Sequence, residues 1–167
     1  MTVRIRAYDP TDLDAIWRVR TWAVENTSAL WDFEPETPAE THQWISRHLD
    51  FGTVLVAEDE SSRCVGFGAL GPWRSNAGYL HTAENSIYVD PAFHRQGVGR
   101  ALLVALQDVC VDLNFHVLVA EIEANNRASI RLHESLGFTV VGITREVGWK
   151  CGHWLALAAS QWISTTG

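Results

Sequence analysis

A strand that runs directly into a long, glycine-opened helix constrains the fold of this chain more than any other feature. The strand is predicted over residues 82–89 and stops at Asp90-Pro91, and the helix is predicted over residues 97–113. Apolar residues recur along the helix at Leu102, Leu106, Val109, Cys110 and Leu113. This spacing gives the helix one buried face, so it must pack on a sheet or on another helix.

The elements after this helix alternate in type. A strand is predicted over residues 117–122, a helix over residues 127–136 that stops at Gly137, and a strand over residues 138–143. The order strand, helix, strand, helix, strand is typical of an α/β arrangement, β-α-β-α-β, in this half of the chain.

The remaining elements complete a mixed sheet. Strands are predicted over residues 3–8, 53–57, 64–70 and 154–160, and helices from Asp12 to about residue 24 and from Thr37 to about residue 49. The second and third of these strands form a hairpin across a polar turn. Because no repeat and no linker-like stretch divides the sequence, we expect one domain, residues 1–167.

Composition excludes several classes of function. The 167 residues carry a formal net charge of −7, which disfavours nucleic acid and anionic membranes as partners. The three cysteines are far apart and show no metal-ligand spacing, so we expect free thiols, a reducing cytoplasmic location and no metal. The N-terminus does not resemble a signal peptide, and no apolar run approaches the length of a membrane span.

The turn between the central strand and the long helix has the chemistry of an anion site. The N-terminus of a helix presents unpaired N–H groups and the positive end of its dipole. Gly97 and Gly99 allow a close backbone approach, and Arg95 and Arg100 add positive charge. The alternative is a glycine-containing helix start with solvated arginines. No Gly-Lys-Ser/Thr follows, so the turn is not a Walker A loop, and its late position disfavours a dinucleotide fingerprint.

Two motifs at this turn and beyond it carry a resemblance to a known family. Residues 90–103, with the core His94-Arg95-Gln96-Gly97-Val98-Gly99-Arg100, resemble the acetyl-CoA motif of the GNAT superfamily, although the first Gln or Arg of that motif is His94 here. Residues 125–138 resemble the later motif of the superfamily, in which Asn126 occupies the cofactor-contacting position. The resemblance implies an α+β GNAT fold with a single, mostly antiparallel seven-stranded sheet and about four flanking helices.

The same resemblance implies how acetyl-CoA is held. Backbone groups of Ile87, Tyr88 and Val89 would meet the pantetheine arm in a strand-like manner, so side-chain identity matters little there. The pyrophosphate would lie on Arg95, Gln96, Gly97, Val98, Gly99 and Arg100. An N–H group at Val89 or its neighbour would stabilise the oxyanion that develops on the thioester of acetyl-CoA during acetyl transfer.

Four further segments narrow the resemblance to one subgroup. Residues 26–29, 71–74, 81–89 and 148–154 are similar to phosphinothricin and methionine sulfoximine N-acetyltransferases, and the likeness covers essentially the whole chain. It implies a homodimer that acetylates the α-amino group of a small amino-acid-like compound, such as phosphinothricin, methionine sulfoximine or methionine sulfone. The chain departs from the subgroup at residues 31–34, in the first substrate loop.

Glu84 is the preferred general base. Strand alternation places Thr82, Glu84, Ser86 and Tyr88 on one face of the central strand. A carboxylate on a largely apolar strand is unusual, and desolvation would raise its pKa toward neutrality. The alternative is a strand-end carboxylate that bonds a neighbouring amide.

His133 is the second catalytic candidate, because the resemblance to the subgroup implies an acid or base at this position. It lies beside a helical face predicted from Ala128, Leu132 and Leu136, so a packed core histidine is the alternative. Phe138 stands where many members of the superfamily have a tyrosine near the thiolate of coenzyme A. The proton that the thiolate needs must therefore come from another group or from solvent.

Residues of the early loops are the candidates for acceptor binding. Arg74 offers a guanidinium fork for a carboxylate or phosphinate, beside Trp73. Thr82, Phe33, Lys150 and Trp154 are weaker candidates, whose aromatic members could equally pack in the core or at a dimer interface.

Two other functions remain open at this point. A protein or peptide N-acetyltransferase would need an open groove, whereas the Trp-rich loops near Arg74 suggest a closed pocket. A non-catalytic acyl-CoA sensor would keep the glycine turn but would not need Glu84.

Overall fold

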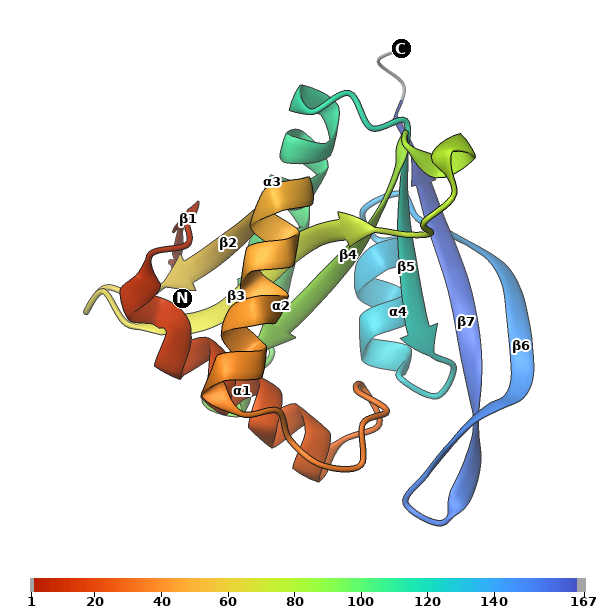
Figure 1. Ribbon diagram of the computed structural model, residues 1–167, viewed down its shortest axis with the longest axis horizontal. Helices are drawn as coiled ribbons and strands as arrows, with labels where there is room; N and C mark the ends of the chain where they lie inside the picture. Colours follow the sequence, from red (N-terminus) through yellow and green to blue (C-terminus); the bar gives the residue numbers. More distant parts are fainter. Residues whose placement is uncertain (1, 165–167) are drawn as a thin grey trace.

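Strands β4 (Thr82–Val89) and β5 (Val117–Glu123) lie at the centre of the sheet in the computed structural model, which describes residues 2–164 (Figure 1). The sheet has seven strands in the order β1-β2-β3-β4-β5-β7-β6. The β4–β5 pair is parallel and the five other pairs are antiparallel. The predicted mixed, mostly antiparallel seven-stranded sheet is therefore confirmed.

The other elements follow the predicted order. The remaining strands are β1 (Arg4–Ala7), β2 (Thr53–Glu58), β3 (Cys64–Pro72), β6 (Thr139–Lys150) and β7 (His153–Ile163). The four α-helices are α1 (Leu13–Asn26), α2 (Pro38–Phe51), α3 (Val98–Asp112) and α4 (Arg127–Glu134).

The helices cover the two faces of the sheet in pairs. Helices α1 and α2 pack on one face, around a core that includes Ile16, Ile45 and Phe67. Helices α3 and α4 pack on the other face, around a larger core that includes Leu102 and Ile130. Because both faces are covered, β3 is buried along almost its whole length, as its nearly continuous apolar sequence predicts.

The parallel pair separates soon after it begins. Only Thr82, Ala83 and Glu84 of β4 are paired with β5, and beyond Glu84 the two strands diverge (Figure 1). On its other side β4 stays paired with β3 as far as Val89. The edge of β4 that faces β5 therefore has no strand partner from residue 85 to residue 89, and a wedge opens between the two strands.

The C-terminal hairpin is longer than the sequence pattern predicts. Strands β6 and β7 extend over 12 and 11 residues, and their closed end projects beyond the rest of the sheet (Figure 1). Strand β6 is an edge strand that is exposed along most of its length. Without a buried face it shows no clear alternation, so its second half lacks the usual signal.

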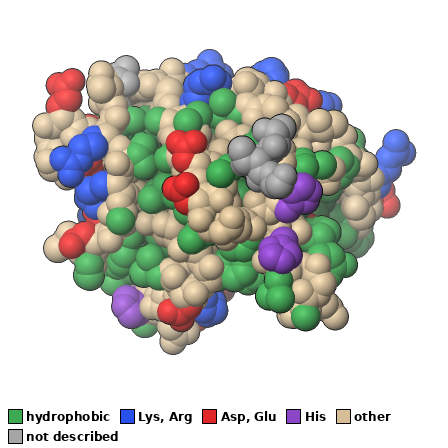
Figure 2. Space-filling view, turned by 90° about the horizontal axis from the view of Figure 1, so that it is seen from above, with side chains coloured by type: hydrophobic (Ala, Val, Ile, Leu, Met, Phe, Trp, Pro, Cys, Tyr) green, Lys and Arg blue, Asp and Glu red, His purple; other side chains and the backbone are tan. Residues whose placement is uncertain are grey.

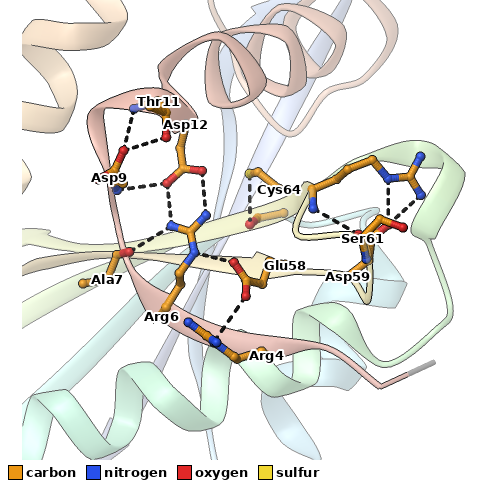
Figure 3. Close-up of polar contacts among 12 residues, drawn as sticks. Arg4, Arg6, Ala7, Asp9, Thr11, Asp12, Glu58, Asp59, Ser61 and Cys64 are labelled. Carbon is orange, nitrogen blue, oxygen red and sulfur yellow. Dashed lines mark hydrogen bonds and ion pairs between the residues drawn. The ribbon is translucent and has the colours of Figure 1, made fainter.

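An ionic cluster joins β1 to the start of α1. Arg6 donates to Glu58 through Nε, and its two terminal nitrogens donate to Asp12 at 2.7 and 2.9 Å (Figure 3). The Asp12 carboxylate also accepts the backbone N–H of Asp9 at 2.9 Å. Asp12 and Glu58 are buried, so Arg6 compensates two carboxylates that would otherwise be costly.

Charge is not concentrated at the end of the molecule where β4 and β5 lie closest. Viewed from above, this end carries acidic, basic and histidine side chains scattered among apolar ones (Figure 2). The wedge opens at the opposite end, where β4 leads into the glycine turn.

Candidate active site

A large cleft occupies the wedge between β4 and β5. Its volume is about 1220 Å³. Its walls are the second halves of both strands, the start of α3, one side of α4, the second half of α1, and residues 27–31 after α1. Ile87, Tyr88 and Val89 all line it, as do Glu84 and His133. The structure thus brings the predicted base and the predicted cofactor strand to one site.

The backbone of the glycine turn has the shape of an anion cradle. Arg95 and Gly97 both have positive φ, at 59° and 87°, which turns successive N–H groups toward one side. Gly97 is the N-cap of α3 and supplies no side-chain hydrogen bond to the helix. The first N–H groups of α3, from Val98 onward, therefore lie at the cleft with no side-chain cap.

The side chains of this turn are engaged within the protein. Gln96 donates to the Ala92 carbonyl at 3.1 Å, and Arg100 donates to the Ser135 hydroxyl at 3.1 Å. The His94 Nε2 atom lies 3.0 Å from the Val89 carbonyl. The main contribution that this turn can offer an anion is thus its backbone, supplemented by the charges of the two arginines.

Asn126 begins α4 at the edge of the same cleft. Its Oδ1 accepts the backbone N–H of Ser129 at 3.1 Å and so caps the helix. Because the carbonyl oxygen is used in this way, the amide nitrogen is the end of the side chain that could meet a ligand.

Glu84 lies half-buried in the cleft, with a strongly perturbed acidity. Burial, and to a lesser degree the nearby carboxylate of Glu121, raise its pKa to about 7, and Arg74 opposes both effects. A carboxylate with this pKa exchanges its proton near neutral pH, as a general base requires.

Glu121 is a site residue that the sequence reasoning missed. It lies on β5, two residues beyond Val119, the strand partner of Glu84, and it lines the same cleft. Its Oε1 accepts hydrogen bonds from Trp73 Nε1 at 3.1 Å and from Arg74 at 3.2 Å. Its signal in the sequence was the one used for Glu84, a carboxylate within an apolar strand.

Trp73 and Arg74 therefore reach the cleft through Glu121. The guanidinium of Arg74 also lies over the Trp73 ring, 4.7 Å from the ring centroid. Neither residue lines the cleft directly. Their combined effect is to hold the Glu121 carboxylate and to supply one positive charge near two acidic groups.

His133 is buried and has both ring nitrogens within hydrogen-bond distance of protein atoms. Nδ1 lies 2.9 Å from the Ser129 carbonyl, and Nε2 lies 3.1 Å from Oδ1 of Asn85. Asn85 in turn donates to the Val119 carbonyl of β5 at 3.1 Å. Burial lowers the pKa of His133, so the neutral imidazole is favoured. The ring thereby links α4 to both strands at the point where they diverge.

The predicted helical face around His133 was correct for Leu132 and Leu136, which pack against the core, and wrong for Ala128. The buried residues of α4 are Ile130 and His133, whereas Ala128 is exposed. The helix is turned so that the histidine itself points into the core, where its ring lies edge-on to Phe138 with centroids 4.9 Å apart.

The weaker acceptor candidates lie away from the cleft surface. Phe33 is exposed, Trp154 is exposed on the C-terminal hairpin, and Thr82 lies at the opposite end of β4. Lys150 is buried beneath residues 24–30. None of the four lines the cleft.

The cleft fits a large anionic cosubstrate such as acetyl-CoA. An uncapped helix N-terminus and a turn with two positive φ angles suit a pyrophosphate. The unpaired edge of β4 suits an extended arm that carries amide groups.

Within residues 2–164, no three His, Cys, Asp or Glu side chains are grouped as metal ligands would be, and no helix has the length and apolar character needed to cross a membrane.

Fold and cleft together define an acetyltransferase, and comparison with known proteins places the chain within one family. The chain belongs to the acetyltransferase (GNAT) family, whose model matches residues 16–138, and it is an N-acetyltransferase. It is 39% identical over 157 residues to the L-methionine sulfoximine/L-methionine sulfone acetyltransferase of Salmonella typhimurium, covering 94% of this chain and 92% of that protein.

Two solved structures extend the comparison. A phosphinothricin acetyltransferase from Sinorhizobium meliloti, in complex with acetyl-CoA, superposes with a TM-score of 0.95 at 31% identity and covers 98% of this chain and 89% of its own. A ribosomal-protein-alanine N-acetyltransferase from Brucella melitensis superposes with a TM-score of 0.93 at 41% identity. The match covers 96% of this chain and 99% of that protein. The family is thus common to all three relatives, while their acceptors differ.

Proposed function

We propose that this protein transfers the acetyl group of acetyl-CoA to the α-amino group of a small amino-acid-like acceptor of the methionine sulfoximine, methionine sulfone or phosphinothricin type. The observation that carries the proposal is Glu84, a half-buried carboxylate with a pKa near 7, on the strand that leads into the glycine turn. The names of two of the three relatives described above support this acceptor class.

Acetyl-CoA is expected to lie along the unpaired edge of β4. The backbone of Ile87, Tyr88 and Val89 would hold the pantetheine arm, and the glycine turn would hold the pyrophosphate. The turn residues assigned to this role are Arg95, Gln96, Gly97, Val98, Gly99 and Arg100, with Asn126 beside them. The cosubstrate supplies the activated acetyl group, and the protein supplies position and charge.

Glu84 acts on the acceptor. An amine arrives mainly as an ammonium ion and must lose a proton before its nitrogen can attack a carbonyl carbon. Glu84 takes this proton, directly or through a water molecule, and an N–H group at Val89 or its neighbour stabilises the oxygen that becomes negative. The departing thiolate takes its proton from a group other than Phe138, which has none to give.

The acidic pair in the cleft favours a cationic acceptor. Glu84 and Glu121 together attract an ammonium group, and Arg74 and Trp73 hold Glu121 in place. An acceptor carboxylate would have to share Arg74 with Glu121. Phe33, in the loop after α1, and Thr82, at the first position of β4, both lie off the cleft and would contact an acceptor only after a rearrangement.

His133 is proposed to position Asn85 and the two strands. Both of its ring nitrogens lie within hydrogen-bond distance of protein oxygens, and the ring is buried. This geometry supports a positioning role better than the role of a proton carrier.

A homodimer in the cytoplasm completes the proposal. Strand β6 is an exposed edge with apolar side chains at Val141, Ile143, Val147 and Trp149, a combination that favours burial against another chain. The free thiols of Cys64, Cys110 and Cys151 suit a reducing compartment.

The function is tested by following thiol release from acetyl-CoA with a panel of amines. The panel contains methionine sulfoximine, methionine sulfone, phosphinothricin, and peptides that begin with alanine. Peptides enter because of the ribosomal-protein-alanine relative, which is a specific reason to test a protein N-terminus as the second candidate acceptor. Turnover of the peptides alone would refute the small-acceptor proposal, and acetyl-CoA binding without any turnover would indicate a sensor.

Glu84→Gln tests the base. The amide has the same shape but cannot take the proton, so kcat should fall by about 10²- to 10⁴-fold while acetyl-CoA affinity stays constant. Glu60→Gln, on an exposed turn, is the matched control. Unchanged turnover of the Glu84 variant would remove this residue from the mechanism.

A further inference from the structure

Lys150 is the only lysine in this chain. The other 12 of the 13 basic residues are arginines. It ends strand β6 and is 5% exposed, which is rare for a residue whose charge normally stays in water. A buried ammonium must find hydrogen-bond partners, and its partners indicate what it does.

The Lys150 ammonium binds three backbone carbonyls from one short segment. It donates to Val24 at 2.7 Å, to Thr27 at 2.9 Å, and to Leu30. Val24 belongs to the last turn of α1, where the helix dipole is negative and the carbonyls lack helical partners. The three N–H groups of the ammonium thus match three carbonyls, an arrangement that a planar guanidinium cannot reproduce.

A second contact joins the same two segments. Gly148, two residues before Lys150, lies against the ring of Trp31, and a Cβ atom at this position would come within 2.4 Å of two ring carbons. The Trp31 indole donates to the Ser28 carbonyl at 2.9 Å. The residue at 148 must therefore be small for the indole to occupy this place.

The segment held by these contacts is a wall of the cleft. Residues 27–31 line the same cavity as Glu84. Across the cleft, Ser28 donates to the buried carboxylate of Glu123 on β5 at 3.4 Å. The segment has no regular structure of its own between α1 and α2 apart from these contacts, so its position depends on them.

We propose that Lys150 is a positioning residue that fixes residues 27–31 as the acceptor wall and so sets the size of acceptor that reaches Glu84. The identity of the acceptor rests on the proposed function. The position of residues 27–31 rests only on the hydrogen bonds of Lys150. Charge is useful here because three strong hydrogen bonds hold a segment that has no regular secondary structure.

The kinetic test uses Lys150→Met, which keeps most of the side-chain length and removes the donors. The KM for the small acceptor should rise roughly tenfold, the factor expected from the loss of about one charged hydrogen bond. The kcat and the acetyl-CoA affinity should change much less, and bulkier amines should gain relative to small ones. Arg47→Met removes a cation from an exposed site on α2 and should change none of these values.

Gly148→Ala perturbs the second contact of residues 27–31, the one between Gly148 and Trp31. The added methyl group displaces the Trp31 indole while Lys150 is unchanged, so the same rise in acceptor KM is expected. This variant decides the matter if Lys150→Met fails to fold. Parallel losses of kcat, acceptor affinity and acetyl-CoA affinity in Gly148→Ala would overturn the proposal, because a general structural defect would explain them.

A readout without turnover separates this proposal from the proposed function. In protein labelled with ε-¹⁵N-lysine, Lys150 should give one ammonium resonance that exchanges slowly with water. Hydrogen exchange of residues 27–31 should accelerate in Lys150→Met and stay constant in Arg47→Met. If the wild type acetylates no small amine but these signals appear, the wall stands and the acceptor is wrong. If exchange at residues 27–31 is the same in all three proteins, the wall is refuted.

Discussion

Glu121→Gln should shift the acid limb of the pH–rate profile of this enzyme toward lower pH. The substitution keeps the size of the side chain and an oxygen for Trp73 and Arg74, and it removes one negative charge beside Glu84. That charge raises the pKa of Glu84, and Arg74 lowers it. The variant removes the first effect and leaves Arg74 without a competing carboxylate, so both changes favour the ionised base.

The size of the shift follows from the strand geometry. Glu121 lies on β5 two residues beyond Val119, the last residue of that strand paired with β4, so the two side chains are separated by at least roughly 7 Å, the diagonal spacing of regularly paired strands. Two unit charges at this distance interact by about 0.6 kcal/mol in water and by about 2.4 kcal/mol at the effective dielectric of a protein surface. Divided by about 1.36 kcal/mol per pKa unit, this gives roughly 0.4 to 1.7 units. Because Arg74 already pairs with Glu121, we expect about 0.5 to 1 unit.

The assay is kcat/KM for the acceptor, measured as thiol release from about pH 5 to pH 9. A base with a raised pKa is active only above that pKa, so the wild-type rate should rise through about pH 7. In Glu121→Gln the same rise should occur at lower pH, with little change in the plateau. Glu60→Gln removes an equal charge from an exposed turn and controls for net charge. A limb that stays in place would show that Glu121 does not contribute to the pKa of Glu84, and a limb that moves to higher pH would refute the reasoning outright.

Two other changes test the cofactor turn and the fold. Gly97→Ala places a side chain at φ 87° with open space around its Cβ atom, so only the backbone conformation becomes unfavourable, by about 1–2 kcal/mol. A turn that relaxes from this conformation should bind coenzyme A more weakly, as measured by calorimetry. Unchanged affinity would argue against the positive-φ cradle. Arg6→Ala leaves the buried carboxylates of Asp12 and Glu58 without their shared partner and should cost about 2–4 kcal/mol in urea unfolding. The comparison is Arg63→Ala, whose arginine is 67% exposed and whose loss should cost under about 1 kcal/mol; equal costs would contradict the ranking by burial.

Elements with a buried face could be predicted from the sequence. Helix α2 begins as expected, with Thr37 accepting the N–H of Glu40 and the Glu40 side chain returning to the Thr37 backbone. The strand before the glycine turn and the helix after it were also placed within a residue, because apolar periodicity is strong where one face is covered. Strand β6 was underestimated because it is exposed along most of its length.

The candidate site was predicted in part. Glu84 and the glycine turn were found because each is unusual within its own segment. Glu121, Asn85 and the hydrogen bonds of Lys150 were missed, because each depends on a partner that is distant in sequence: a residue of the neighbouring strand, a histidine 48 residues away, and carbonyls about 120 residues earlier. A single sequence gives residue types along the chain but not the pairing of segments across a sheet.

Strand β4 also fixes the distance between two parts of the proposed site. It carries Glu84, the proposed base, and ends at Val89, the last residue of the proposed cofactor strand, so five residues of extended backbone set the spacing between these two positions at about 17 Å. Inserting or deleting one residue here would turn Glu84 to the opposite face of the sheet, because side chains alternate along a strand. Adaptation to a new acceptor is therefore restricted to the surrounding loops, while the strand itself can tolerate substitution but not a change in length.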